Sequence, residues 1–491
     1  MHRARPPCRE QDGAVSEPDP RRWKALAVSL AAGFMTLLDV SIVNVALPSV
    51  QNGLGASAGS VQWIVSGYAL TFGLSLVAGG RLGDVLGRRT MFLVALTAFV
   101  VTSALAGAAP NETLLIGARL LQGLAAGLLS PQNSGLIQDL FRGAERGRAF
   151  GLLGATIGIS TATGPVLGGL ILAVFGDETG WRWVFFVNVP VGVLAFVLAL
   201  RWLPRSDRGK VQLRDEIDHV GALLLGLAVL GVLLPIVETE SGGAGPLWLL
   251  AVATPVFGYV FVRWEQRVSA RGGKPLLDLR LFTDVSGYSS GLLLGSVYFC
   301  GFAGIFLVMS LFLQKGLHYT PLQSGLTVTP FAVGSSIMAA VAGRLVSRLG
   351  RKLTVGGLSL ITIGLAAVAV VVRLAPQDVI GGAIAFPLLV AGIGGGAVIS
   401  PNTTLTLECV PNRIAGVAGG ALQTGQRMGT AIGTAVLATV FYAGIGNPTA
   451  AVSRTLLCAI GFMLVAIVIA LYELRRATTA DRADARPAAG D

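Results

Sequence analysis

The sequence predicts an all-α integral membrane protein with fourteen transmembrane helices, arranged as two pseudo-symmetric six-helix halves plus two inserted helices. Three observations predict this fold. Hydrophobic residues make up 53% of the 491 residues and charged residues only 13%, whereas soluble domains carry about 25% charged residues. Apolar runs of transmembrane length recur along the whole chain, and a charged motif beside one of them returns in the second half.

The apolar runs define the expected helices in order. A helix needs about 20 apolar residues to cross a hydrocarbon core of about 30 Å. Because backbone groups in lipid must be hydrogen-bonded within the structure, and because the runs are much longer than barrel strands, we expect helices. The fourteen runs lie at 24–46, 60–79, 90–109, 112–138, 148–175, 183–203, 219–237, 247–264, 287–311, 324–346, 353–373, 379–407, 414–441 and 452–473.

The distribution of basic residues predicts how these helices are oriented. Lys and Arg total 37 against 26 Asp and Glu, a net charge of +11, which in a soluble protein would suggest a nucleic-acid partner. If both termini lie inside, 31 of the 37 bases fall in inner segments and four in outer ones. Because inner loops are enriched in Lys and Arg, we expect a multi-pass membrane protein with cytoplasmic termini and no nucleic-acid partner. Usage rich in Gly, Ala and Arg suggests a GC-rich bacterial genome, so we expect the membrane to be the bacterial inner (plasma) membrane.

An internal repeat predicts two related halves. The segment 80–89 (GRLGDVLGRR) returns at 343–352 (GRLVSRLGRK), and Ser130-Pro131 returns as Ser400-Pro401. Such parallel repeats are related by an axis along the membrane normal and enclose a substrate cavity between them. The expected division is a cytoplasmic N-tail (1–22), a six-helix bundle (23–203), a linker with two extra transmembrane helices (204–286), a second six-helix bundle (287–474) and a cytoplasmic C-tail (475–491).

Four motifs carry a resemblance to a known family. They are 38–48 (LDVSIVNVALP) in the first span, 80–89 after the second, 119–127 (RLLQGLAAG) in the fourth and 158–169 (GISTATGPVLGG) in the fifth. With these motifs, residues 23–474 resemble the major facilitator superfamily, specifically its fourteen-span drug:proton antiporter family. The resemblance implies a bacterial multidrug efflux transporter, active in antibiotic resistance, that exports hydrophobic compounds in exchange for protons by alternating access. It implies no cofactor besides the proton-motive force, and a monomer.

Two charges inside the predicted spans are the candidates for proton coupling. Asp39 lies in the first span and Arg119 in the fourth, at similar depth from the outer side. A charge within a span costs at least about 2.5–3.5 kcal/mol and marks a pathway or a pair. Our hypothesis is that Asp39 takes up and releases protons while Arg119 stabilises its ionised form. A fixed structural ion pair without proton traffic is the alternative.

Three polar residues are candidates for the substrate cavity: Asn44, Gln122 and Arg427. Arg427 lies near the middle of the thirteenth span, where it either offsets substrate charge, closes a gate or bonds helix carbonyls. Glu408 falls near the inner end of the twelfth span, where it either lines the cavity or faces the cytoplasm. Membrane-embedded acids are few, so neutral, zwitterionic or monocationic hydrophobic compounds fit better than dications.

The repeated motif is a candidate conformational latch. In it, the glycines Gly80 and Gly87 permit a tight turn, and Asp84 can meet the positive start of the following helix. Arg88 and Arg89 hold the loop inside, and the resemblance implies that the loop latches one conformation through interdomain charge contacts. A topology anchor alone is the alternative. The second copy has Ser347 in place of Asp84, so any latch is asymmetric.

The fifth span carries small residues that match the antiporter motif of the resembled family: Gly154, Gly158, Gly164, Pro165, Gly168 and Gly169. Small residues let helices approach closely, and proline can kink a span. The functional interpretation is a hinge or proton seal between the fifth and eighth of the twelve spans in the two halves. Plain close packing is the other interpretation, and the two are compatible.

Other classes of protein fit the sequence less well. An ATP-driven pump would need a GxxxxGK[ST] loop, and an enzyme would need a convergent catalytic set; the sequence has neither. The cysteines and histidines form no metal-ligand cluster, so no metal site is expected. The duplicated halves favour alternating access over a channel. A proton-coupled exporter or importer of a specific metabolite or nutrient, and a membrane sensor or assembly partner without transport, remain as alternatives.

Overall fold

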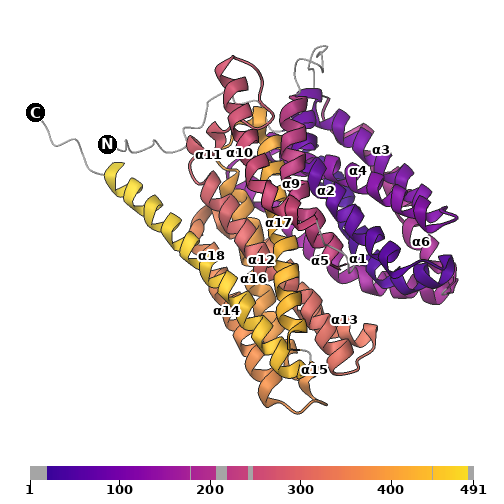
Figure 1. Ribbon diagram of the computed structural model, residues 1–491. Helices are drawn as coiled ribbons and strands as arrows, with labels where there is room; N and C mark the ends of the chain where they lie inside the picture. Colours follow the sequence, from indigo (N-terminus) through magenta and orange to yellow (C-terminus); the bar gives the residue numbers. More distant parts are fainter. Residues whose placement is uncertain (1–18, 177, 206–217, 241–246, 445, 485–491) are drawn as a thin grey trace, which may run out of the picture.

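The computed structural model describes residues 19–176, 178–205, 218–240, 247–444 and 446–484, and these residues form helices joined by short turns (Figure 1). The first helices are α1 (Arg22–Leu54), α2 (Ala58–Leu86), α3 (Arg88–Gly107), α4 (Glu112–Leu140), α5 (Gly143–Phe175), α6 (Gly180–Phe186), α7 (Asn188–Trp202), α9 (His219–Glu240) and α10 (Trp248–Ala270). They are followed by α11 (Arg280–Thr283), α12 (Tyr288–Leu311), η2 (Phe312–Gly316), α13 (Pro321–Leu349), α14 (Arg351–Leu374), α15 (Ile380–Ala383), α16 (Ala385–Thr406), η3 (Asn412–Ile414), α17 (Ala415–Tyr442) and α18 (Pro448–Asp484).

Each predicted apolar run falls on a helix or on a closely joined pair of helices. The sixth run is divided between α6 and α7 at Val187, and the twelfth between α15 and α16 at Ile384. Within the described residues, 12 helices are long and apolar enough to cross a membrane. The expected count of fourteen is therefore not confirmed.

The two predicted spans outside that set of 12 are α10 and α17. The last turns of α10 carry Arg263, Glu265 and Arg267, and charged side chains reduce its hydropathy. Helix α17 is instead rich in glycine, threonine and glutamine and contains Arg427. Small and polar residues lower hydropathy while allowing close helix packing. Both segments are helical, and their composition explains why they are less apolar than the 12 other predicted spans.

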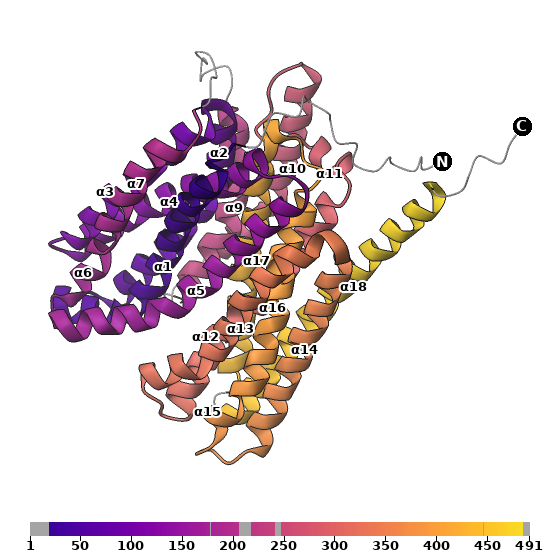
Figure 2. The ribbon, with the colours of Figure 1, turned by 180° about the vertical axis from the view of Figure 1, so that it is seen from behind.

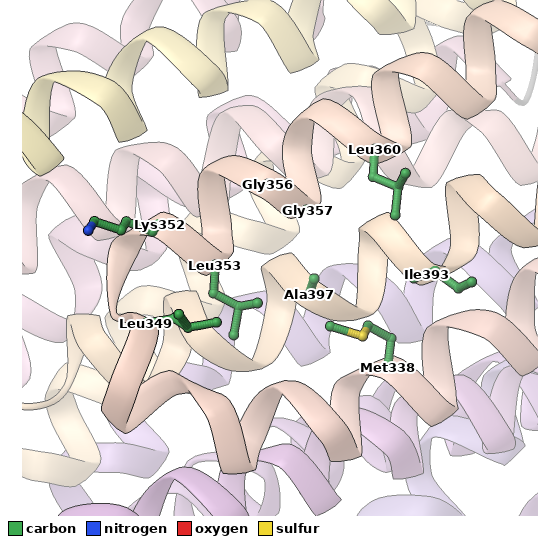
Figure 3. A pocket seen from close by; sticks show the side chains of 9 residues that line it. All are labelled: Met338, Leu349, Lys352, Leu353, Gly356, Gly357, Leu360, Ile393 and Ala397. Atoms are coloured by element: carbon green, nitrogen blue, oxygen red, sulfur yellow. The ribbon is translucent and has the colours of Figure 1, made fainter.

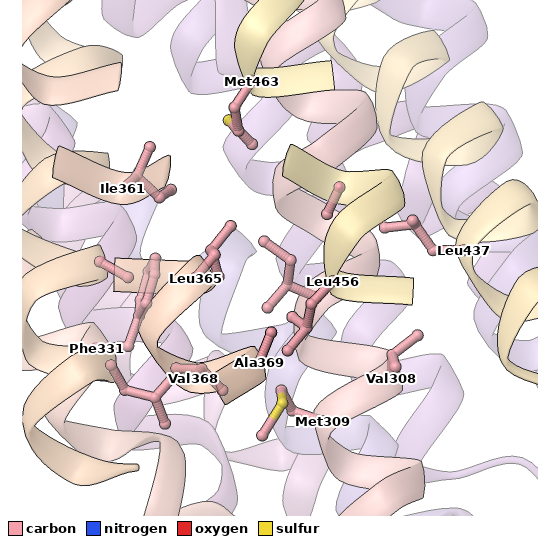
Figure 4. Close-up of a cluster of buried hydrophobic side chains, with 14 of the residues drawn as sticks. Val308, Met309, Phe331, Ile361, Leu365, Val368, Ala369, Leu437, Leu456 and Met463 are labelled. Atoms are coloured by element: carbon pink, nitrogen blue, oxygen red, sulfur yellow. The ribbon is translucent and has the colours of Figure 1, made fainter. Parts of the chain in front are cut away.

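The helices pack as two large sets, one formed by α1–α7 and one by α12–α18 (Figure 1). We call these the first and second helix sets. The first has a core of buried residues that includes Met35, Phe92 and Phe99. The core of the second includes Met309, Phe331 and Leu456, which belong to the cluster drawn in Figure 4. Since lipid is as apolar as these side chains, such close packing is what holds membrane helices together.

The inserted helices form a hairpin beside the two sets. Helices α9 and α10 pack against each other, and α9 also contacts α2 and α17. At one end of the hairpin the Trp264 Nε1 donates to Asp218 Oδ2 (2.8 Å), while Asp218 Oδ1 accepts from the amide of Gly221 (2.8 Å). These bonds connect the start of α9 to α10.

The two helix sets meet along two seams. Helix α2 packs along α17, and α5 packs along α13, so each seam joins one helix of the first set to one of the second. Figures 1 and 2 show the sets close together near α2 and α17 and diverging toward the ends where α6 and α15 lie. Close contact between the sets is therefore concentrated toward one end of the molecule.

Candidate functional site

The structure brings Asp39 and Arg119 together as a buried ion pair. Arg119 Nη1 lies 2.6 Å from Asp39 Oδ2, and the two side chains are 1% and 0% exposed. Arg119 also donates from Nε to the carbonyl of Ile64 (3.0 Å), and its guanidinium lies 4.1 Å from the ring centroid of Tyr68. Helices α1, α2 and α4 thus hold the two charges in one fixed arrangement.

Two amides complete this site. Gln122, one turn after Arg119 on α4, donates to Asp39 Oδ1 (3.0 Å) and accepts from Arg119 Nη1 (2.8 Å). Asn188 at the start of α7 donates to Asp39 Oδ1 (2.8 Å) and to Ser103 Oγ (3.0 Å). The site therefore contains Gln122, which we expected to line the substrate cavity.

Sequence reasoning missed Asn188. Its signal was present, because Asn188 is a single amide within an apolar stretch and lies two residues before Pro190. The helix is interrupted at Val187, between α6 and α7, and this break places the Asn188 side chain at the first turn of α7. A polar residue at a helix break inside an apolar run is expensive to bury unless it is hydrogen-bonded. Such a residue is therefore a site candidate.

The arrangement has a clear chemical consequence for Asp39. Its two oxygens face three donors, from Arg119, Gln122 and Asn188. Hydrogen bonds to a carboxylate favour its ionised form. Arg119 and Gln122 on α4 and Asn188 on α7 thus supply the hydrogen-bond partners that a buried carboxylate needs.

The remaining residues considered for the cavity have different surroundings. The Asn44 side chain is exposed on α1. Arg427 is half-buried on α17, and its guanidinium lies 4.4 Å from the ring centroid of Phe72 on α2. Glu408 is exposed just beyond α16. Of the residues proposed for the cavity, Arg427 is the one that lies at a seam between the helix sets.

Arg427 is held differently from the other embedded arginine. Within the described part of the chain, no carboxylate lies within ion-pair distance of Arg427 and no carbonyl accepts a hydrogen bond from it. A charge in a membrane span costs about 2.5–3.5 kcal/mol, and a desolvated cation–π contact returns about 2 kcal/mol. The Phe72 ring therefore offsets only part of the cost.

An aromatic pair on α2 connects the two arginines. Tyr68 and Phe72 are one turn apart, with ring centroids separated by 6.1 Å. Arg119 lies over the first ring and Arg427 over the second. Both rings are buried. The two arginines therefore pack against neighbouring rings of one helix.

The first copy of the repeated motif joins the two helix sets. Asp84 Oδ1 accepts from the amide of Gly416 (3.0 Å), and Oδ2 accepts from the amide of Val417 (2.9 Å). These amides are in the first turn of α17, where N–H groups lack helical partners and the helix dipole is positive. Asp84 thus caps a helix of the opposite set, as a latch would require.

The arginines of this motif have separate partners. Arg88 pairs with Asp84 (2.9 Å) and with Asp139 (2.6 Å), and it donates to the carbonyl of Asn412 in the second set (3.1 Å). Arg89 instead donates to the carbonyl of Leu200 within the first set (2.7 Å). Between α2 and α3, Gly87 has a φ of +90°, a conformation that favours glycine.

The second copy of the motif makes different contacts. Arg351 donates to Asn402 (2.6 Å) and pairs with Glu473 (2.6 Å), both in the second helix set. Ser347, at the position equivalent to Asp84, is exposed. The charged contact across the sets is thus made by the first copy, in line with the asymmetry of the two motifs.

Glycines form the close contacts of both seams. A Cβ added to Gly80 would overlap the carbonyl of Gly416 on α17. The equivalent Gly343 of the second copy faces α5, where an added Cβ would lie 2.6 Å from the Cα of Gly151. The first glycine of each motif copy therefore lies at a close approach between the two helix sets.

The glycines of the fifth-span motif are divided between two partners. Gly154 and Gly158 face α13, against Ala339 and Ser336, while Gly164 and Gly168 face α1. An added Cβ on Gly169 would have no neighbour within 4 Å, and the side chain of Pro165 lies outside the described part of the structure. Gly147 and Gly151, which sequence reasoning missed, continue the same face of α5 toward Gly343.

A pocket of about 210 Å³ lies within the second helix set, among α13, α14 and α16 (Figure 3). Its walls are almost entirely apolar, with one lysine at an end. No predicted cavity residue lines it, so it is separate from the cavity expected between the halves. Its lining residues are Met338, Leu349, Lys352, Leu353, Gly356, Gly357, Leu360, Ile393 and Ala397.

We predict that Asp84→Asn weakens the contact between the helix sets. The asparagine side chain cannot form the ion pair with Arg88, and it has only one oxygen to accept hydrogen bonds from α17 where aspartate has two. Hydrogen–deuterium exchange of the Gly416 and Val417 amides should become faster, and transport should fall about tenfold. Asp139→Asn is the matched control, because it removes the same charge from Arg88 without touching α17. Equal effects of the two variants would contradict a latch at Asp84.

Comparison with known proteins identifies the family. The sequence model of the Major Facilitator Superfamily matches residues 29–434 and 291–489. The probable actinorhodin transporter of Streptomyces coelicolor is 38% identical over 454 residues, covering 90% of this chain and 76% of that protein. The puromycin resistance protein pur8 of Streptomyces alboniger is 37% identical, covering 88% and 84%. The tetracenomycin C resistance and export protein of Streptomyces glaucescens is 31% identical, covering 87% and 77%.

Solved structures show the same fold at low sequence identity. The human organic anion transporter MFSD10 (TETRAN) superposes with a TM-score of 0.65 at 15% identity, covering 92% of this chain and 100% of that one. The proton:xylose symporter XylE gives 0.63 at 16% identity, covering 91% and 96%. With the family match over most of the sequence, these findings show that the chain belongs to the major facilitator superfamily, as a multi-pass membrane protein whose relatives are named as transporters and resistance proteins.

Proposed function

We propose that the chain is a secondary active transporter that exports hydrophobic drugs or antibiotics in exchange for protons by alternating access. The observation that carries this proposal is the membrane-buried Asp39, held by Arg119 and two amides in the first helix set. The relatives support drug export, because their names describe resistance to antibiotics and, for tetracenomycin C, export.

The finer assignment is to the fourteen-span drug:proton antiporter family. In this assignment α10 and α17 also cross the membrane, and 23–203 and 287–474 are the two moving halves. Both termini lie in the cytoplasm, so the end where α2 meets α17 is the inner end. The protein acts as a monomer and uses the proton-motive force in place of a cofactor.

The contacts suggest how a transport cycle would proceed. With the seams closed at the inner end, Asp39 is ionised and paired with Arg119. Proton binding at Asp39 releases Arg119, which changes the packing of Tyr68 on α2. Since α2 is also the helix that carries Asp84 and Gly80, this change reaches the contact with α17 and permits opening toward the cytoplasm.

One proton supplies enough energy for useful export. A membrane potential of about 150 mV corresponds to about 3.5 kcal/mol per charge. At 1.4 kcal/mol for each factor of ten, that energy sustains a gradient of roughly 300-fold. A single titrating site such as Asp39 is therefore sufficient for the proposed exchange.

Everted membrane vesicles provide the test. The protein is expressed in a bacterial strain without its own efflux pumps, and a pH gradient is established and followed with an acridine dye. We expect compounds from a panel of hydrophobic antibiotics to accumulate in the vesicles and to dissipate the gradient, and an uncoupler to abolish both effects. Accumulation that is unaffected by the uncoupler would contradict proton exchange. No response to any compound would favour a sensor or a transporter of a specific metabolite.

A further inference from the structure

We propose that Arg427 binds the anionic group of the exported compound, so that the transporter prefers organic anions, a carboxylate or phenolate on an apolar body. This proposal rests on the proposed export function and adds a substrate class to it. It departs from the preference for neutral, zwitterionic or monocationic compounds expected from the scarcity of acids in the spans.

The first step of the argument is the position of Arg427. It lies on α17 and contacts Phe72 on α2, so its guanidinium sits between the two helix sets that alternating access separates. Arg119 is 1% exposed, but Arg427 is half-buried. Arg427 is therefore less completely enclosed than Arg119.

The second step is the pairing of charges. Arg119 pairs with Asp39, Arg88 with Asp84 and Asp139, and Arg351 with Glu473. In the described portion of the protein, Arg427 has an aromatic ring for a partner and no carboxylate. An arginine presents five N–H donors and stays charged at all relevant pH values. An anion from outside the chain is the partner that this group lacks.

The third step is the character of the surroundings. The Phe72 ring that contacts Arg427 is buried, and so is Tyr68, one turn before it on α2. A small, strongly hydrated anion would lose its water in such a place without compensation. An anion joined to an apolar body satisfies both the charge and the apolar neighbours.

The fourth step connects this position to the proton site. The rings of Phe72 and Tyr68 lie between the two arginines. An anion that draws Arg427 away from Phe72 would therefore disturb the same aromatic pair that Arg119 contacts. Substrate binding and proton binding would then both act on the Tyr68 and Phe72 rings of α2.

Two dyes with the same tricyclic skeleton and opposite charge test the proposal: anionic fluorescein and cationic rhodamine 123. Their binding to the purified full-length protein in lipid nanodiscs is measured by fluorescence anisotropy. We expect fluorescein to bind at least tenfold more tightly than rhodamine 123. Arg427→Gln should weaken fluorescein binding about tenfold without weakening rhodamine 123 binding, and Arg427→Lys should retain most of the preference.

Arg373→Gln is the matched control, because it removes an equal charge from an exposed position at the end of α14 and should leave both affinities unchanged. The proposal is overturned if the wild-type protein prefers rhodamine 123, binds the dyes equally or binds neither. It is also overturned if Arg427→Gln weakens both equally. Because binding in nanodiscs needs no proton gradient, a lack of export in vesicles would refute the proposed function without deciding this result.

Discussion

Asp39→Asn should abolish proton-coupled export while leaving the protein able to bind its substrate. Asparagine has nearly the same shape, and its carbonyl oxygen can still accept from an amide donor, but it does not titrate. We expect substrate-driven dissipation of the pH gradient in everted vesicles to fall at least 100-fold, on the scale of about 2.7 kcal/mol. Asp39→Glu, which retains a carboxyl group, should keep part of the activity.

Folding must be separated from proton coupling in this experiment. Removing one partner of a buried ion pair destabilises a protein by about 3–5 kcal/mol, because the other charge stays buried. The double variant Asp39→Asn with Arg119→Gln removes both charges and should fold with a thermal stability closer to wild type, yet still lack proton exchange. Asp378→Asn is the control at an exposed position. Full proton-dependent transport by Asp39→Asn, alone or combined with Arg119→Gln, would show that the pair is only structural.

Much of the site could be predicted because charges in apolar runs are rare. Asp39 and Arg119 are conspicuous in the sequence, and their similar depth follows from helix geometry. The structure places Arg119 Nη1 2.6 Å from Asp39 Oδ2. What the sequence could not provide is the orientation of neighbouring helices about their own axes. Asn188 joins Asp39 only because α7 begins at a break and turns its first residue inward.

The seams between the helix sets illustrate the same limit. The repeat at 80–89 and 343–352 predicted two equivalent halves, but not which helix each copy would meet. In the structure Gly80 faces α17 and Gly343 faces α5. The latch residue Asp84 reaches the amides of α17 because that helix begins beside it. Such pairings depend on long-range packing, which local sequence does not encode.

The number of spans could not be fixed for a related reason. Hydropathy identifies helices that contact lipid, whereas α17 packs against α2, α12 and α18. A helix that contacts several others can carry glycine, glutamine and Arg427 in place of leucine and valine on the faces that meet them. The feature that lowers its hydropathy is thus the one that lets it form a seam.

Gly80→Ala should reduce transport at least tenfold by forcing α2 and α17 apart. Alanine favours helix over glycine by about 0.8–1 kcal/mol, so α2 itself should become more stable. However, the new Cβ would overlap the backbone carbonyl of Gly416, which cannot rotate away as a side chain could. The closed arrangement at this end would be lost, and exchange of the Gly416 and Val417 amides should become faster.

Two further variants determine whether the contact or the helix is responsible. Gly59→Ala lies in the first turn of the same helix, where the nearest atom to an added Cβ is 3.9 Å away, so it replaces a glycine of α2 by alanine without a clash and should transport normally. Gly343→Ala meets the backbone of Gly151 in the equivalent seam and should resemble Gly80→Ala. If Gly80→Ala were as active as Gly59→Ala, closure along α2 and α17 would not be required for transport, and the alternating-access mechanism proposed for these seams would fail.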